Sequence, residues 1–407
     1  MRTQVGIIGA GPSGLVLSHL LYLHGIDSVI LESRSQAYVE ARMRAGVLDS
    51  DVTALFKAVG VGERMMKEGL PQEQMEIRFE GKRRYINWKE LAGGRVNMVY
   101  GQQEVVKDFI QRRQQDGGKL FFEAQALRIT DLDGRPTIEY MHEGQQKKLE
   151  CEIVAACDGY HGIGRRTIPA DKLEAYELNY SFAWLGIVAE ARPSSKWLVT
   201  SAHERGYAMH SMRSPSISRN YLQIPLTDTV DDWSDERIWQ ELQTRLETDA
   251  DWKLEEGAIL EKTRFDIRSF VCHTMRYKKM FLAGDSAHMV PPTGGRGLNQ
   301  AIADVCILAD GLADYFKKSS SAHLERYTDL CLQRVWHAQQ FTWRMTSVLQ
   351  RLDWENKNPY HRQVQIAQLE YLTSNRAAAT SLAECYAGMP LQTSFLPSDR
   401  PQYPLVI

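Results

Sequence analysis

The sequence of 407 residues lacks the patterns that mark several classes of protein. Its six cysteines form no CxxC pair and no zinc-module spacing, so we expect reduced thiols in a cytoplasmic protein. The 11 histidines contain no HExxH pattern, so we expect no metal site. No apolar run approaches the roughly 20 residues of a membrane span, and we expect no signal peptide. A net charge of -2 gives no general attraction to nucleic acid or to an anionic membrane, which points to a small ligand.

What the sequence does contain is an alternation of buried strands and helices. Residues 4–32 read as a βαβ unit, and 278–316 read as a buried strand, a glycine-rich loop and a helix. The order predicts an α/β fold: a Rossmann-like nucleotide-binding domain, an inserted β-rich domain and a helical C-terminal region. The expected boundaries are 1–175 with 268–330 for the first domain, interrupted by strands of the second near 72–100, then 176–267, 331–390 and an irregular tail at 391–407.

Three glycines, Gly9, Gly11 and Gly14, form a GxGxxG pattern between the first strand and the first helix, and Glu32 ends the next strand. Such glycines permit a tight turn and close approach of a pyrophosphate, while the carboxylate accepts ribose hydroxyls. A structural turn is the alternative, and the pattern alone does not separate FAD from NAD. Two later segments, 157–168 and 281–304, favour a single cofactor threaded through the domain, because Asp285 and a helix start follow a buried strand in the second.

A strand pattern over 206–213 places Tyr207, Ser211 and Arg213 on one face, because side chains alternate along a strand. Residues 219–223 form the second strand of the same hairpin. A guanidinium on such a face can bind a carboxylate bidentately, and a neighbouring hydroxyl or phenol can complete its hydrogen bonds. The hairpin therefore predicts a site for an aromatic acid, with an internal salt bridge between strands as the alternative.

Several motifs resemble those of the single-component FAD-dependent aromatic hydroxylases, and in particular the 4-hydroxybenzoate 3-hydroxylases. They are RMRAGVLD at 42–49, VYGQQEV at 99–105, DG at 158–159, SMR at 211–213, GD at 284–285 and VPPTGGRGLN at 290–299. The resemblance covers about residues 1–390. It implies FAD bound in the first domain, a transient nicotinamide reductant, O2, a small aromatic acid bound by the β-rich domain, and a homodimer.

The implied reaction is hydroxylation of a para-substituted benzoate at carbon 3 through a flavin hydroperoxide. Overall similarity favours 4-hydroxybenzoate, converted to 3,4-dihydroxybenzoate, and 4-aminobenzoate is the alternative. An NAD-dependent dehydrogenase and a non-catalytic flavoprotein are more remote alternatives. NADPH is the expected reductant, with NADH left open, because Ser33 stands where the family typically has a basic residue and Arg34 follows only one position later.

The resemblance also implies roles for individual residues. The positions expected to contact the cofactor are Gly9, Gly11, Gly14, Glu32, Arg42, Arg44, Gln102, Asp158, Asp285, Leu298 and Asn299, and Arg219, which influences movement of the flavin. Those expected to contact the reductant are Arg34, Tyr38, His161, Arg165 and Arg268. The benzoate carboxylate is expected on Ser211, Arg213 and Tyr221, and the residues expected around the reacting ring are Thr200, Pro292, Thr293 and Tyr386.

Two positions depart from the family. Thr200 stands where a tyrosine binds the substrate phenol, and Gln72 stands where a histidine passes the proton to solvent. Threonine is too short to reach a distant phenol unaided, and glutamine does not titrate. A 4-amino group activates the ring without first losing a proton, which favours 4-aminobenzoate at these positions. A local shift in register, which would let Tyr207 or His210 take over, is the other interpretation.

Overall fold

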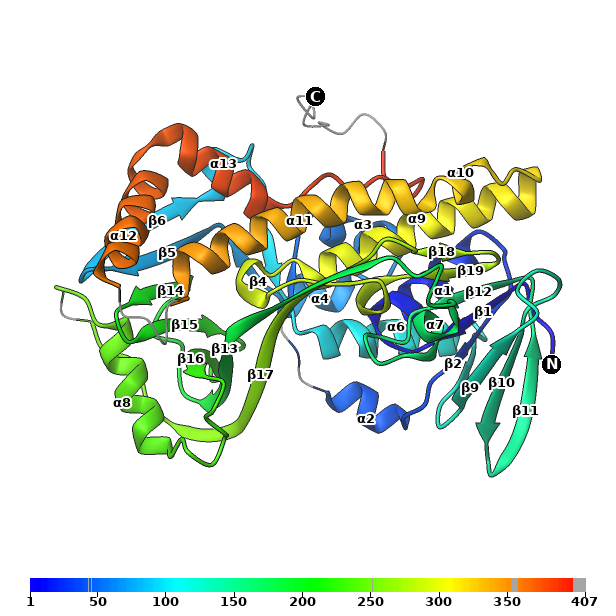
Figure 1. Ribbon diagram of the computed structural model, residues 1–407, viewed down its shortest axis with the longest axis horizontal. Coiled ribbons are helices and arrows are strands. Elements are labelled where there is room, and N and C mark those ends of the chain that lie inside the picture. The colour runs from blue at the N-terminus through cyan, green and yellow to red at the C-terminus, as the bar shows by residue number, and fades with distance from the viewer. Residues whose placement is uncertain (43, 45, 251, 353–357, 398–407) are drawn as a thin grey trace.

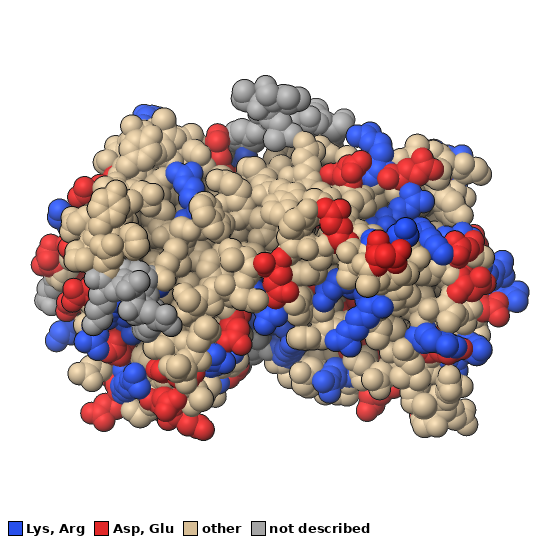
Figure 2. Space-filling model, in the orientation of Figure 1, with Lys and Arg blue, Asp and Glu red and all other residues tan. Residues whose placement is uncertain are grey.

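The computed structural model describes residues 1–42, 44, 46–250, 252–352 and 358–397. Two lobes lie side by side, and the long strands β13 (Ala175–Glu190) and β17 (Ala258–Cys272) run between them (Figure 1). Basic and acidic side chains are interspersed on the face seen in Figure 2, in keeping with the small net charge. In the described part of the chain, every helix is too short or too polar to cross a membrane.

One lobe is built on a six-stranded sheet that is parallel except at one edge. Its strands in spatial order are β18 (Arg276–Tyr277), β19 (Met280–Leu282), β12 (Ile153–Ala156), β1 (Val5–Ile8), β2 (Ser28–Leu31) and β8 (Lys119–Phe121). The inner strands are buried apolar runs, as expected for a parallel sheet that is covered on both faces.

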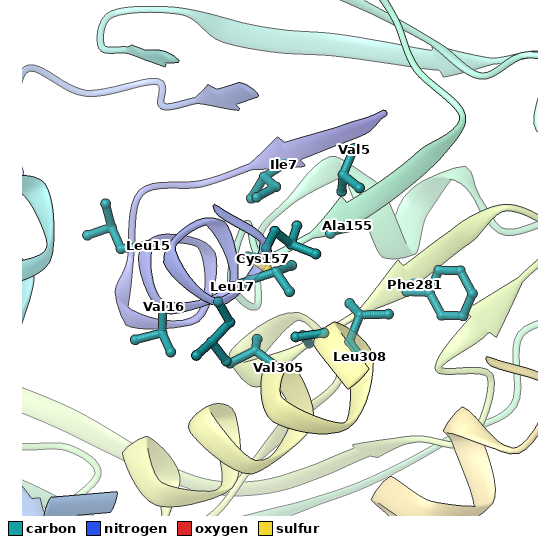
Figure 3. Packing of buried hydrophobic residues seen from close by; sticks show 14 of the residues in the cluster. Val5, Ile7, Leu15, Val16, Leu17, Ala155, Cys157, Phe281, Val305 and Leu308 are labelled. Atoms are coloured by element: carbon teal, nitrogen blue, oxygen red, sulfur yellow. The ribbon is translucent and has the colours of Figure 1, made fainter. Parts of the chain in front are cut away.

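Helices cover one face of this sheet and a second, smaller sheet covers the other. The helices are α1 (Pro12–Leu23), α6 (Gln102–Gln115) and α9 (Gly297–Lys318), and α1 packs against both of the others. Figure 3 shows Leu17 of α1 on the side of that helix that faces Val305 of α9. The opposing sheet comprises β9 (Gln125–Thr130), β10 (Thr137–His142) and β11 (Gln145–Glu150).

The other lobe is built on an eight-stranded sheet. Its strands in spatial order are β20 (His288–Met289), β17, β13, β16 (Ser218–Pro225), β15 (Gly206–Met212), β14 (Leu198–His203), β5 (Gln74–Phe79) and β6 (Lys82–Asn87). One face packs against α8 (Asp235–Leu246) through an apolar cluster that includes Trp233 and Trp239. The opposite face packs against C-terminal helices through a cluster that includes Trp184, Tyr207 and Tyr386.

The remaining elements are a small sheet and the other helices. A small sheet holds β3 (Val47–Leu48), β7 (Asn97–Val99) and β4 (Leu70–Gln72). The other helices are α2 (Gln36–Ala41), α3 (Ser50–Ala58), α4 (Glu63–Glu68), α5 (Trp88–Leu91), α7 (Ile163–Thr167), α10 (Ala322–Glu325), α11 (Tyr327–Leu349), α12 (Pro359–Ser374) and α13 (Arg376–Ala387), with 3-10 turns η1 (Gly284–Ser286) and η2 (Pro292–Gly294). Helix α11 lies along the top of both lobes in Figure 1.

The α/β fold class and the helical C-terminal region are confirmed. The hydroxyl of Ser234 caps the start of α8 by accepting from the N–H of Arg237. Residues 50–69 form two helices, α3 and α4, which are separated where Gly60 adopts a φ of 75°. The domain boundaries stay a proposal. In the expected tail, 391–397 carries no helix or strand, and 398–407 lies outside the described residues.

Candidate active site

The glycine loop after β1 leaves open space on one side only. Gly9 has a φ of 101°, and a Cβ there would meet the carbonyl oxygen of Cys157 at 2.4 Å. A Cβ on Gly14 would meet the carbonyl oxygen of Gly9 at 2.0 Å, so this glycine lets α1 pack onto the loop. A Cβ on Gly11 would meet no atom within 4 Å. The open side of the loop thus lies at the start of α1, where backbone N–H groups favour a phosphate.

Glu32 stands directly beside this loop, at the end of β2. Its carboxylate accepts hydrogen bonds from the backbone N–H groups of Ala10, at 2.8 Å, and Arg34, at 2.8 Å. These bonds fix the carboxylate between the two parallel strands. Because a carboxylate has about four acceptor positions, it can also accept from the hydroxyls of a ribose.

Charged side chains from several segments gather around Arg44. Burial lowers the pKa of Arg44, the nearby charge of Arg42 lowers it further, and Asp285 in η1 opposes the shift. These three residues, far apart in sequence, therefore lie within electrostatic reach of one another. A pair of guanidiniums beside one carboxylate leaves net positive charge, which suits a pyrophosphate.

Asp158 lies beside Gly9 of the glycine loop, and its side chain bonds within the protein. One of its oxygens accepts from the N–H of Gly164 in α7 at 2.8 Å, and the other is buried without a partner in the described structure. Burial raises the pKa of this carboxyl group. Gln102, the first residue of α6, makes no side-chain hydrogen bond within the described residues and stays available to a ligand.

The start of α9 presents backbone donors. The N–H groups of Gly297, Leu298 and Asn299 belong to the first turn and have no intrahelical acceptor. The side chain of Asn299 is committed elsewhere: its oxygen accepts from the N–H of Asp49, and its nitrogen donates to the carbonyl of Val47. Only the backbone of Asn299 can therefore face a cofactor ring, where the helix dipole would stabilise negative charge.

The residues predicted to contact a reductant fall into two groups. His161, Arg165 and Arg268 surround Tyr160: both guanidiniums lie 5.0 Å or less from its ring, and the two aromatic rings meet edge to face. Arg165 also donates to the carbonyl of Ser286, and Arg268 forms an ion pair with Glu177.

The second group lies near α2. The guanidinium of Arg34 stands 5.2 Å from the ring of Tyr38, and both residues are exposed. In the described chain, no three or more His, Cys, Asp or Glu side chains are grouped so that they could hold a metal ion.

Two arginines without acidic partners mark the hairpin of β15 and β16. Arg213 donates to the side-chain oxygen of Gln103, at 2.7 Å, and to the carbonyl of Arg44, at 3.3 Å. Arg219 is buried, and its Nε and Nη1 atoms have no hydrogen-bond partner among the described residues. Neither guanidinium forms an ion pair within the described chain, so the alternative of a salt bridge between strands is wrong there.

The neighbours of these arginines can complete an anion site. Strand register pairs Ser211 with Arg219, and the Ser211 hydroxyl donates to the Arg219 carbonyl at 3.1 Å. Tyr221 lies one pair along the sheet, and the guanidinium of Arg219 stands 5.1 Å from its ring. Burial lowers the pKa of Arg213, and the charge of Arg219 lowers it further. Because the two cations repel each other, a carboxylate between them would be strongly favoured.

The residues that departed from the family pattern are already bonded within the protein. The hydroxyl of Thr200 donates to the carbonyl of Glu76 on β5, at 3.4 Å. Gln72 is buried, and its amide joins the carbonyl of Lys196 to the N–H of Leu198. His210 points to the opposite face of the sheet, where it bonds to Asn220 and Ser194, and burial lowers its pKa to about 4. The interpretation in which His210 takes over is therefore wrong.

Two tyrosine hydroxyls remain without partners. The hydroxyls of Tyr207 and Tyr386 are both buried and have no hydrogen-bond partner in the described structure. Tyr207 is stacked on Trp184, with ring centroids 5.0 Å apart, and Tyr386 packs edge-on against Phe341 at 4.9 Å. Sequence reasoning named Tyr207 only as a member of the face and as a substitute under a shifted register. No signal in the sequence shows that its hydroxyl lacks a partner.

The loop between β20 and α9 completes the site. Pro292 is exposed, whereas Thr293 is buried and its hydroxyl lies 3.0 Å from that of Thr346 on α11. Arg296 donates to the carbonyl of Tyr386 and to the carboxylate of Asp49. The loop, the start of α9 and the segment that carries Tyr386 are thus held together.

Comparison with known proteins agrees with this geometry. A family model described as FAD binding domain matches residues 2–342. The chain is 41% identical to p-hydroxybenzoate hydroxylase of Acinetobacter baylyi over 97% of its own length and 98% of that protein. It is 24% identical to a 3-(3-hydroxy-phenyl)propionate/3-hydroxycinnamic acid hydroxylase of Mycobacterium avium, over 76% of this chain and 55% of that protein. The crystal structure of p-nitrophenol 4-monooxygenase from Pseudomonas putida superposes with a TM-score of 0.80 at 18% identity, covering 95% of this chain and 99% of the other.

Proposed function

The chain belongs to the family of FAD-dependent aromatic hydroxylases that includes p-hydroxybenzoate hydroxylase, and we propose that it hydroxylates a para-substituted benzoate at carbon 3. It is a flavin-dependent monooxygenase. We propose 4-hydroxybenzoate as the substrate, with 3,4-dihydroxybenzoate as the product, and NADPH as the reductant, with NADH as the alternative. The relative that matches over nearly the whole chain carries the name of this substrate.

The observation that carries the substrate class is the pair of cations on the hairpin, of which Arg219 is buried and Arg213 is partly buried. Arg213 and Arg219 have no acidic partner among the described residues, and two N–H-bearing atoms of Arg219 make no hydrogen bond there. A buried, uncompensated guanidinium is unfavourable unless an anion binds it. A carboxylate that accepts from Arg213, Arg219 and the hydroxyl of Tyr221 would compensate both cations, and Ser211 could donate to it by giving up its bond to the Arg219 carbonyl.

The residues along the nucleotide domain fit FAD. The open side of Gly11, the carboxylate of Glu32 and the arginines near Asp285 suit its pyrophosphate and ribose, and the first turn of α9 suits its ring. We propose that Arg42, Gln102, Asp158, Leu298 and Asn299 contribute to the same site. When bound and reduced, FAD supplies the activation of O2 and the transfer of one oxygen atom to an electron-rich ring.

The protein's own residues would orient the ring and exclude water. With the carboxylate held on the hairpin, the para end of the benzoate extends along β15 toward Tyr207 and Tyr386. The aromatic side chains there belong to an apolar cluster that is closed to solvent, as oxygen transfer requires. Pro292 and Thr293 would border the reacting carbon from the loop before α9.

One observation favours 4-aminobenzoate as a second candidate. Thr200 and Gln72 are bonded to backbone groups, and Gln72 cannot titrate, so these positions offer no route for a phenolic proton to solvent. An amino group activates the ring without losing a proton. We keep this substrate as the alternative to 4-hydroxybenzoate.

The test is a panel of para-substituted benzoates, scored for consumption of NADPH, NADH and O2 together with hydroxylated product. We expect one substrate to accelerate flavin reduction and to give nearly one product per reductant consumed. Release of hydrogen peroxide with every acid would contradict the substrate class. Yellow absorption of the purified protein would distinguish the proposed monooxygenase from an NAD-dependent dehydrogenase. Turnover of substrate would distinguish it from a non-catalytic flavoprotein.

The carboxylate site is tested with Arg213→Ala. Loss of a buried, charged hydrogen bond costs about 2–5 kcal/mol, so we expect at least a 30-fold weaker dissociation constant for every benzoate. Arg128→Ala is the matched control, because Arg128 is an exposed arginine on β9, in the other lobe, paired with Glu139. Unchanged binding in Arg213→Ala would show that the carboxylate binds elsewhere.

We also propose a cytoplasmic homodimer. The outer face of α11 exposes Trp336 and Trp343, two helical turns apart, and Trp336 joins Tyr176 and His273 in an aromatic cluster on the surface. Exposed tryptophans of this kind are typical of an interface rather than of a free surface. The free cysteines of the described chain support a reducing compartment.

A further inference from the structure

We propose that Tyr207, together with Tyr386, binds the para substituent of the substrate, and that Thr200 does not take part. The inference rests on the proposed function, because it needs a benzoate with its carboxylate on Arg213. It assigns the para end of the site to a side chain of β15, whereas the family comparison points to the position on β14. Tyr207 would thus determine which para substituents the enzyme accepts.

The first argument is that the hydroxyl of Thr200, on β14, already has a hydrogen-bond partner within the protein. Thr200 pairs with Ile77 on β5 and with Met209 on β15, so its side chain lies on the substrate face of the sheet. It is nevertheless 1% exposed, and its hydroxyl donates to the backbone of the neighbouring strand. The bond uses the only proton of the Thr200 hydroxyl, so as bonded Thr200 has no hydrogen to donate to a ligand.

The second argument is that Tyr207 is fixed in place with an unused hydroxyl. Its ring is stacked at an angle of 17° on Trp184, whose indole N–H donates to the side chain of Gln350 at 3.1 Å. Its backbone N–H donates to Gln223. The side chain is fully buried, and its hydroxyl has no partner in the described structure. Buried polar groups without partners are rare in folded proteins, and such a group at a binding site points to a ligand.

The third argument is that a second unused hydroxyl belongs to the same cluster. Tyr386 comes from α13, packs against Trp88 and Phe341, and shares an apolar cluster with Tyr207 and Tyr221. Its carbonyl accepts from Asn97 and Arg296, so the backbone that carries the ring is held from two sides. Two buried tyrosines of one apolar cluster therefore carry hydroxyls that have no partner in the described structure.

The chemistry of two hydroxyls matches a polar para substituent. Each phenol can donate one hydrogen bond and accept another. A para amino group can donate to both oxygens, and a para hydroxyl group can donate to one and accept from the other. An unsubstituted benzoate leaves both tyrosines unpaired and should bind less tightly, because a site built around polar groups discriminates against ligands that lack them.

The test compares Tyr207→Phe with Thr200→Val in the FAD-loaded protein. Dissociation constants for 4-hydroxybenzoate, 4-aminobenzoate and unsubstituted benzoate are measured from the change in flavin absorption. We expect Tyr207→Phe to weaken binding of the two para-substituted acids by about 10-fold, the effect of one hydrogen bond, and to leave benzoate unchanged. Thr200→Val should leave all three constants within about 2-fold. Phenylalanine keeps the stacking on Trp184, so the variant is expected to fold.

Four outcomes overturn the proposal. An equal loss for all three acids would show that Tyr207 acts only through packing. If Thr200→Val, and not Tyr207→Phe, weakens binding of the para-substituted acids alone, then Thr200 on β14 binds the para substituent. If wild-type protein binds none of the three acids, the proposed substrate class fails, and the role of Tyr207 fails with it. Suppose that wild-type protein binds benzoate, that Arg213→Ala abolishes this binding, and that Tyr207→Phe has no effect specific to the para substituent. These results together would refute only the present inference.

Discussion

The buried ion pair between His288 and Asp304 allows a quantitative prediction of stability. His288 on β20 and Asp304 on α9 meet at 2.6 Å, and both side chains are 2% exposed. The same oxygen of Asp304 accepts from the N–H of Gly284 at 2.9 Å. Asp304→Asn removes the charge and leaves His288 buried without a carboxylate. Breaking a buried pair from one side costs about 3–5 kcal/mol, and we expect about 3 kcal/mol because asparagine can still accept one hydrogen bond.

The expected shift in melting temperature follows from the size of the chain. At about 2.1 cal/mol/K per residue, 407 residues have an unfolding entropy of about 0.9 kcal/mol/K. A loss of about 3 kcal/mol then lowers Tm by about 3.5 °C if the chain unfolds as one unit. Asp235→Asn is the matched control, since Asp235 pairs with Lys262 but is 58% exposed, and we expect a loss of at most about 1 kcal/mol, or ~1 °C.

The pH dependence gives the same pair a second test. Burial alone would lower the pKa of His288, but the charge of Asp304 and its hydrogen bond outweigh burial, so the pKa is raised. A raised pKa means that the folded state holds the proton more tightly than the unfolded state. The stabilisation is therefore complete below the unfolded value of about 6.5 and is lost as pH rises through the folded value. Calorimetry of both proteins from pH 6 to 9 should show the difference in Tm shrinking with pH, and a constant or growing difference would refute this account.

Two further predictions concern the cofactor loop and the surface of α11. Gly14→Ala should lower Tm even without flavin, because its Cβ would meet a carbonyl oxygen at 2.0 Å, whereas Gly11→Ala should keep the apoprotein Tm and weaken FAD binding by at least about 10-fold, measured by titration of apoprotein. Equal effects of the two on Tm would contradict the assignment of open space to Gly11. Trp336→Ser combined with Trp343→Ser should halve the mass found by sedimentation, and wild-type protein that sediments as a monomer would contradict the proposed interface.

The features that were predictable from sequence are those set by local chemistry. The spacing of Gly9, Gly11 and Gly14 identifies the turn: Gly9 has a φ of 101°, a Cβ on Gly9 or Gly14 would meet a carbonyl oxygen, and Gly11 leaves open space. Alternation along β15 was enough to place Tyr207 and Arg213 on one face. Both inferences depend on neighbours within a few residues, which the sequence contains directly.

The features that were missed depend on partners far along the chain. Thr200 lies on the expected face, but its hydroxyl is bonded to Glu76, 124 positions earlier, through a parallel pairing of β14 with β5 that no local pattern indicates. The side chain of Asn299 is likewise taken by Asp49, 250 positions away. Strand and helix periodicity shows which face a side chain occupies. Whether its polar atoms are still unpaired depends on tertiary contacts.

The hydrogen bonds of Arg213 have one more consequence. This side chain extends from the substrate hairpin to the side chain of Gln103 in α6 and to the backbone of Arg44, both beside the cofactor domain. An anion that took up one of these N–H groups would withdraw it from α6 or from the Arg44 segment. Binding of an anion at the hairpin would then affect the nucleotide domain through the exchange of a single hydrogen-bond partner. One lobe would not need to move against the other.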